Sequence, residues 1–184
     1  MINVRKAAII GCGFVGSSIA FSLMQRGLYS ELVLIDADRE KAAGEAMDLS
    51  HGLPYTASMR IYAGDYDDVA DCAMVIVTAG ANQKPGETRL DLIGKNVAIL
   101  KSIIPQLTSR NFKGILMIVS NPVDVLTYAA WRLSGLPAHR VIGVEKVLPV
   151  VAKGLMALLE QPENKLVRME PGLRAEIAEH GAVD

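Results

Sequence analysis

Short aliphatic runs alternate with longer stretches of helical periodicity along the first 143 residues. Six runs have the length of strands: residues 6–10, 31–36, 59–63, 74–78, 114–119 and 140–143. Apolar positions recur at helical spacing between them, over residues 15–26, 39–49, 90–111 and 123–134. Strands that alternate with helices form right-handed βαβ units, so the pattern predicts an α/β fold with a doubly wound, mostly parallel sheet.

The pattern weakens after residue 143. Residues 144–159 and 171–180 have helical spacing, and residues 165–169 are compatible with a short strand. The sequence therefore predicts a regular α/β domain over residues 1–143 and a short mixed α/β tail over residues 144–184.

Composition and charge exclude several classes of partner. Of the 184 residues, 51% are hydrophobic and 21% charged, which is typical of a globular chain. The net charge of -1 gives no general reason to bind nucleic acid or an anionic membrane. Cys12 and Cys72 are expected to be buried thiols, and no zinc site is expected. Because no stretch resembles a signal peptide or a membrane span, we expect a cytoplasmic protein.

A glycine-rich turn joins the first predicted strand to the first predicted helix. Its sequence, GCGFVG at residues 11–16, has the G-x-G-x-x-G spacing of dinucleotide-binding turns. Gly11 allows a tight turn, Gly13 lets a pyrophosphate approach the backbone, and Gly16 lets helix and strand pack closely. The helix N-terminus then offers N–H groups to the phosphates. The turn predicts a Rossmann-type domain.

Asp36 ends the second predicted strand, about 20 residues after the glycines, where an acidic residue accepts hydrogen bonds from a ribose. Its carboxylate would repel a 2′-phosphate, so the pattern favours NAD over NADP. The alternative is a tight turn without a ligand, in which Asp36 serves only as a cap. Asp38 is the expected N-cap of the second helix.

Small and polar residues follow the next strands. The small residues 78–81 would let a flat ligand lie against the backbone, although an ordinary turn has the same composition. Asn121 offers an amide to a cofactor or substrate, or caps the following helix. In the polar loop 82–89, Arg89 is suited to polarise a carbonyl and Gln83 to bind a small substrate, unless the loop is merely solvated.

Five motifs stand in the order and spacing of the lactate/malate dehydrogenase family: GCGFVGSS, LVLIDAD, AMDLSHG, VTAGANQKPGETRLDL and VSNPVDVLTYAAW. Residues 4–143 resemble that family, and its bacterial L-lactate dehydrogenases most of all. The resemblance implies NAD as cofactor. It implies a cofactor site formed by Gly11, Gly13, Phe14, Val15, Gly16, Asp36, Lys41, Tyr66, Thr78, Ala79, Gly80, Ala81, Val119 and Asn121.

The resemblance also implies a substrate site for a 2-hydroxy or 2-oxo acid. Arg89 would polarise the substrate carbonyl, and Asn121 and Asp124 would bind the substrate. Gln83 stands where lactate enzymes have glutamine and malate enzymes have arginine, so it favours lactate and pyruvate. Family members form dimers or tetramers, so a homo-oligomer is a possible assembly.

The chain departs from the family's pattern after Gly143. The family continues with an Asp-x-x-Arg segment and a catalytic histidine, whereas this chain continues with VEKVLP. His180 is the candidate acid–base residue, because histidine titrates near neutrality, but an exposed helix position is the alternative. Two functions stay open: hydride transfer between NAD and lactate or pyruvate, weak or absent in this chain alone, and a non-catalytic NAD-binding module. The departure suggests a truncated or engineered chain.

Overall fold

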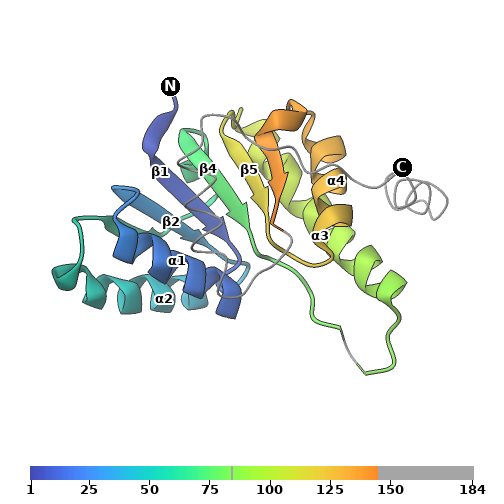
Figure 1. The fold of residues 1–184 in the computed structure, drawn as a ribbon, viewed down its shortest axis with the longest axis horizontal. Coiled ribbons are helices and arrows are strands. Elements are labelled where there is room, and N and C mark those ends of the chain that lie inside the picture. Colours follow the sequence, from blue (N-terminus) through green and yellow to red (C-terminus); the bar gives the residue numbers. More distant parts are fainter. Residues whose placement is uncertain (84, 145–184) are drawn as a thin grey trace.

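A six-stranded parallel sheet forms the centre of the computed structural model, which describes residues 1–83 and 85–144 (Figure 1). Its strands are β1 (Asn3–Ile10), β2 (Glu31–Ile35), β3 (Arg60–Ala63), β4 (Cys72–Val77), β5 (Ile115–Ile118) and β6 (Val141–Gly143). They lie in the order β3-β2-β1-β4-β5-β6, and every neighbouring pair is parallel. The predicted Rossmann-type α/β fold is confirmed. The elements predicted for the tail lie outside the described residues.

Helices cover both faces of the sheet. They are α1 (Phe14–Arg26), α2 (Arg39–Gly52), α3 (Arg89–Ser109) and α4 (Val123–Ser134), with short 3-10 helices η1 (Leu53–Tyr55), η2 (Tyr66–Val69) and η3 (Ala138–Arg140). Alternate strand residues pack into two apolar clusters, as the two-residue period of a strand requires. One cluster lies against α1 and α2, and the other against α3 and α4 (Figure 1).

The predicted elements agree with the structure to within a few residues. β1 begins at Asn3 rather than residue 6, and α3 continues through Pro105 to Ser109. The 3-10 helices were not predicted, because a single turn is too short to carry a periodic signal. Cys12 and Cys72 are both buried free thiols, as expected.

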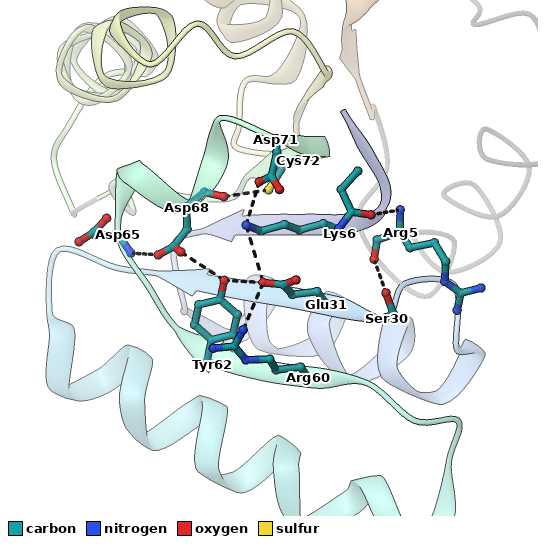
Figure 2. A network of polar contacts seen from close by, with 11 residues as sticks. Arg5, Lys6, Ser30, Glu31, Arg60, Tyr62, Asp65, Asp68, Asp71 and Cys72 are labelled. Carbon is teal, nitrogen blue, oxygen red and sulfur yellow. Dashed lines mark hydrogen bonds and ion pairs between the residues drawn. The ribbon is translucent and has the colours of Figure 1, made fainter. Parts of the chain in front are cut away.

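A network of polar side chains joins the strands at the edge where β2 and β4 begin (Figure 2). Lys6 is only 7% exposed, and its Nζ lies 2.8 Å from Asp71 and 3.7 Å from Glu31. The Tyr62 hydroxyl donates to Glu31 at 2.7 Å and to Asp68 at 3.2 Å. Burying an unpaired ammonium group costs free energy, and the carboxylates of Asp71 and Glu31 offset this cost for Lys6.

None of the helices in residues 1–83 and 85–144 combines the length and apolar character that a bilayer span needs.

Candidate functional site

The strands β1, β2 and β4 all end at the edge of the sheet opposite the Lys6 network. The Gly11 N–H donates to the Ile35 carbonyl at 2.8 Å, which joins the turn after β1 to the end of β2. On the other side, Thr78 and Ala79 both donate N–H groups to the Ile10 carbonyl, at 2.9 and 3.0 Å. The strand order reverses between β1 and β4, and ligands of doubly wound sheets bind at this switch point. We call the ends of β1, β2, β4 and β5, with the segments that follow them, the crevice.

Two glycines of the turn are required by backbone geometry. Gly11 has a φ of 105°, and a Cβ there would lie 2.6 Å from the Ala79 nitrogen. A Cβ on Gly16 would overlap the Gly11 carbonyl oxygen and lie 2.9 Å from the Thr78 hydroxyl. That hydroxyl donates to the same Gly11 carbonyl at 2.7 Å. The close packing of α1 on the ends of β1 and β4 therefore depends on both glycines.

The space in front of α1 fits an anion. Gly13 is the N-cap of α1, and a Cβ built on it would meet nothing within 4 Å. No side chain caps this helix, and its first turn contains no acidic residue. The N–H groups of residues 14–16 have no acceptor within the helix, which leaves them and the positive end of the helix dipole for a ligand. We call this space, with Gly13 and the N–H groups of residues 14–16 around it, the cradle. A diphosphate suits the cradle, whereas a side chain at residue 13 would occupy it.

Asp36 lies beside the cradle and is fixed by two backbone groups. One carboxylate oxygen accepts the Cys12 N–H at 2.6 Å and the other accepts the Asp38 N–H at 3.0 Å. Asp38, and not Asp36, caps α2 by accepting the Lys41 N–H at 3.2 Å. A carboxylate has about four lone-pair sites, so Asp36 retains capacity for ribose hydroxyls.

The outer residues of this half of the crevice are less enclosed. Phe14 is 97% exposed, and Lys41 is exposed in the first turn of α2. Tyr66 opens η2 and is half-buried, with the Arg110 guanidinium 5.9 Å from its ring centre. Burial raises the pKa of the Tyr66 hydroxyl, Arg110 opposes this, and the negative charge of Asp36 adds to the rise. Tyr66 therefore shares an electrostatic environment with Asp36.

The other half of the crevice contains two residues that the sequence analysis missed. Asn96 of α3 accepts the Ala81 N–H and donates to the Asn121 carbonyl, each at 2.7 Å. Ser120 donates its hydroxyl to the Ala79 carbonyl at 2.6 Å. The available signal was an amide on an apolar helix face, because Asn96 is four residues from the buried Leu100.

The residues after β5 are placed differently from one another. Asn121 precedes the N-cap of α4, which is Pro122, so the alternative in which Asn121 caps that helix is wrong. Asn121 is exposed at the crevice, whereas Val119 is 3% exposed and packs in the core, which leaves only its backbone for a ligand. Asp124 is half-buried in the first turn of α4.

The loop before α3 projects away from the sheet (Figure 1). Within it, the Gln83 amide donates to the Glu87 carbonyl at 2.9 Å, and Lys95 pairs with the Glu87 carboxylate. Arg89 is exposed at the first position of α3, just after the capping residue Thr88. Among the described residues, neither Gln83 nor Arg89 forms a hydrogen bond or ion pair with the strand-end residues described above.

The histidines do not supply an acid–base group within the described residues. His51 is in the last turn of α2, and His139 lies in η3, just before β6 begins. α2 starts where β2 ends, so its last turn with His51 lies at the edge where the strands begin. His139 lies at that same edge, because it comes just before β6 in a parallel sheet. His180 lies outside the described residues.

Comparison with known protein families agrees with this geometry. The model of the NAD-binding domain of lactate/malate dehydrogenases matches residues 5–143. The chain belongs to the lactate/malate dehydrogenase family. This match also identifies NAD as the cofactor of the domain, in agreement with the cradle before α1 and with Asp36.

Individual relatives are L-lactate dehydrogenases. The enzyme of Priestia megaterium is 53% identical over 146 residues, which cover 79% of this chain and 46% of the relative. That of Thermoanaerobacterium saccharolyticum is 54% identical over 145 residues, 79% of this chain and 47% of the relative. The chain thus spans less than half the length of these two family members.

Solved structures of lactate dehydrogenases share the fold. The ligand-bound minor L-lactate dehydrogenase of Enterococcus mundtii superimposes with a TM-score of 0.74 at 48% identity, over 76% of this chain and 45% of that one. MGS-M5, a lactate dehydrogenase from a deep-sea metagenome library, gives 0.74 at 51% identity, over 78% and 46%. The family's NAD-binding domain therefore accounts for the described part of this chain.

Proposed function

We propose that this domain binds NAD(H) across the strand ends, with the diphosphate at the N-terminus of α1 and the adenosine ribose on Asp36. The observation that carries the proposal is the combination of an uncapped helix start, an unobstructed Gly13 and a carboxylate already fixed beside them. Phe14, Val15, Lys41 and Tyr66 flank this half. The nicotinamide half is formed by residues 78–81, by the backbone of Val119 and by Asn121.

We further propose that the reaction served by the complete site is hydride transfer between NAD and lactate or pyruvate. Bound NAD(H) supplies the hydride acceptor or donor. Arg89 polarises the carbonyl of the 2-oxo acid through its permanent charge, and Gln83 selects a monocarboxylate. Asn121 and Asp124 bind the substrate beside the nicotinamide. The names of the relatives and the glutamine at position 83 support this substrate class.

Weak or absent turnover is the expected behaviour of this chain alone. Hydride transfer to a carbonyl needs a proton donor, and the described part of the chain contains no histidine at the crevice. Losing an oriented proton donor removes positioning, which supplies roughly 7–11 kcal/mol in favourable cases. The second candidate function is accordingly an NAD-binding module without catalysis, favoured by this same observation.

Isothermal titration tests the binding proposal. The wild-type chain is expected to bind NAD more tightly than NADP, and Asp36→Ala should weaken NAD binding about tenfold or more, by loss of a charged hydrogen-bond acceptor. Asp48→Ala is the matched control, since it removes an exposed carboxylate from α2 away from the glycine turn. Wild-type protein that gives no heat with millimolar NAD would refute the proposal.

Pyruvate-dependent oxidation of NADH separates the two candidate functions. Turnover that disappears in Arg89→Leu, while NADH still binds, supports the oxidoreductase. Binding of NADH without any pyruvate-dependent oxidation supports the module. If turnover exists and His180→Ala leaves it unchanged, His180 is not the acid–base residue.

A further inference from the structure

Two buried polar side chains join the segments that follow β4 and β5, and we call Asn96 and Ser120 the strand-end clasp. Asn96 is 2% exposed and Ser120 is 7% exposed. The amide of Asn96 bridges the Ala81 N–H and the Asn121 carbonyl, with both distances 2.7 Å. The hydroxyl of Ser120 reaches the Ala79 carbonyl at 2.6 Å. The same hydroxyl has a longer contact of 3.4 Å with the Val77 carbonyl, and all four hydrogen bonds of the pair end on backbone atoms.

The clasp begins where the hydrogen-bond ladder of the sheet stops. The last bond between the two strand ends runs from the Val119 N–H to the Val77 carbonyl, at 2.9 Å. Beyond it, residues 79–81 and residue 121 belong to separate connections, which lead to α3 and α4. A buried amide with both ends satisfied holds two such backbones at a fixed separation, because breaking either bond leaves a buried polar group unpaired.

Gly80 lies directly over the clasp. A Cβ built on it would point at the Ser120 Cβ, 3.4 Å away, and at the Asn96 side-chain oxygen, 3.5 Å away. These are ordinary contact distances, so the glycine is not required by crowding. Gly80 is itself exposed, so its uncovered side is bare backbone against which a flat ring can lie. The clasp thus supports this surface from beneath.

We propose that Asn96 and Ser120 are positioning residues that set the spacing of the two backbone segments on which the nicotinamide end of NAD(H) rests. The inference rests on the proposed function, because it takes these segments as the nicotinamide half of the site. The burial of Asn96 means that it acts through Ala81 and Asn121 and not by contact with the cofactor.

The test compares NADH with ADP-ribose, which lacks the nicotinamide but retains the diphosphate and the adenosine. Asn96→Asp preserves the size of the side chain and the acceptor for Ala81, but places a carboxylate oxygen against the Asn121 carbonyl. Ser120→Ala is a milder second variant, because it removes a single hydroxyl. Gln106→Glu is the matched control, an amide-to-acid change at an exposed position of α3.

Calorimetric titration should show NADH binding weakened about tenfold by Asn96→Asp and a few-fold by Ser120→Ala, since a buried hydrogen bond to the backbone is lost in each. ADP-ribose binding should stay within about twofold of wild type, because the glycine turn and Asp36 are untouched. Gln106→Glu should change the affinity for neither NADH nor ADP-ribose. If Asn96→Asp fails to fold, Ser120→Ala gives the same comparison.

Several results would overturn the inference. Equal weakening of NADH and ADP-ribose would show a general structural role, and unchanged NADH binding in both variants would show no role in the crevice. Wild-type protein that binds NADH no more tightly than ADP-ribose would show that these segments do not hold the nicotinamide, and would leave the rest of the proposed function intact. A wild-type chain that binds neither ligand would refute the proposed function itself.

Discussion

Single-methyl substitutions at three glycines separate the folding role of the glycine turn from its ligand role. A Cβ on Gly16 would overlap the Gly11 carbonyl oxygen, whereas a Cβ on Gly13 or on Gly94 would meet nothing within 4 Å. Gly94 lies inside α3 at an exposed position. The added methyl group therefore meets a backbone atom at residue 16, the open cradle at residue 13 and solvent at residue 94.

The expected magnitudes follow from these surroundings. Gly16→Ala should lower the free energy of unfolding by about 1–3 kcal/mol, the usual cost of overpacking, because the obstacle is backbone that cannot rotate away. Gly94→Ala should raise it by about 0.5–1 kcal/mol through helix propensity. Gly13→Ala should lower it by only about 0.5–1 kcal/mol, since alanine is a poorer N-cap than glycine and the φ of -78° suits either residue.

The order of these variants by NAD affinity should differ from their order by free energy of unfolding. Gly13→Ala should weaken NAD about tenfold or more, because its methyl group enters the space assigned to the diphosphate. Gly94→Ala should bind NAD like the wild type. Urea unfolding gives the stabilities and calorimetric titration the affinities. A Gly13→Ala protein with wild-type affinity, or a Gly16→Ala protein as stable as Gly94→Ala, would refute the reasoning.

Two further predictions concern stability. Tyr62→Phe removes a hydroxyl that donates to Glu31 and Asp68, so it should lower the free energy of unfolding by about 1–2 kcal/mol without changing NAD affinity, measured by urea unfolding and titration. Burial raises the pKa of the Cys12 and Cys72 thiols from 9.0 to about 12. Unfolding then releases protons, so stability should fall as the pH rises from about 9 towards 12, by about 1.4 kcal/mol per pH unit for each thiol. Urea midpoints between pH 8 and 10 should fall less steeply in Cys72→Ala, and an equal slope in both proteins would contradict this cause.

The features predicted correctly from sequence are those encoded locally. Each of the six strands contains a short apolar run, and the turn after β1 has its three glycines at fixed spacing, so neighbouring residues carry the signal. The placement of Asp38 as the cap of α2 was also confirmed, because a cap bonds to a residue three positions along the chain.

The features missed by sequence analysis depend on contacts between distant residues. Asn96 bonds to residues 15 and 25 positions away, and the hydroxyl of Ser120 to one 41 positions away. All three partners are backbone atoms, so the residue types at these positions give no sign of the bonds. The same reasoning explains why the hydrogen bond from the Cys12 N–H to Asp36, 24 residues away, was not predicted.

The four helices that start at the crevice differ in whether a side chain caps them. α2 and α3 begin with side-chain caps, Asp38 and Thr88, so one N–H group in the first turn of each helix already has an acceptor. α1 and α4 start at the same edge of the sheet, but neither has a side-chain cap. Uncapped N–H groups cost stability in the free protein, but they are the groups that an anionic or amide-bearing ligand can satisfy. The ion pairs around Lys6 lie at the other edge of the sheet, so the strands are held together there without filling the crevice.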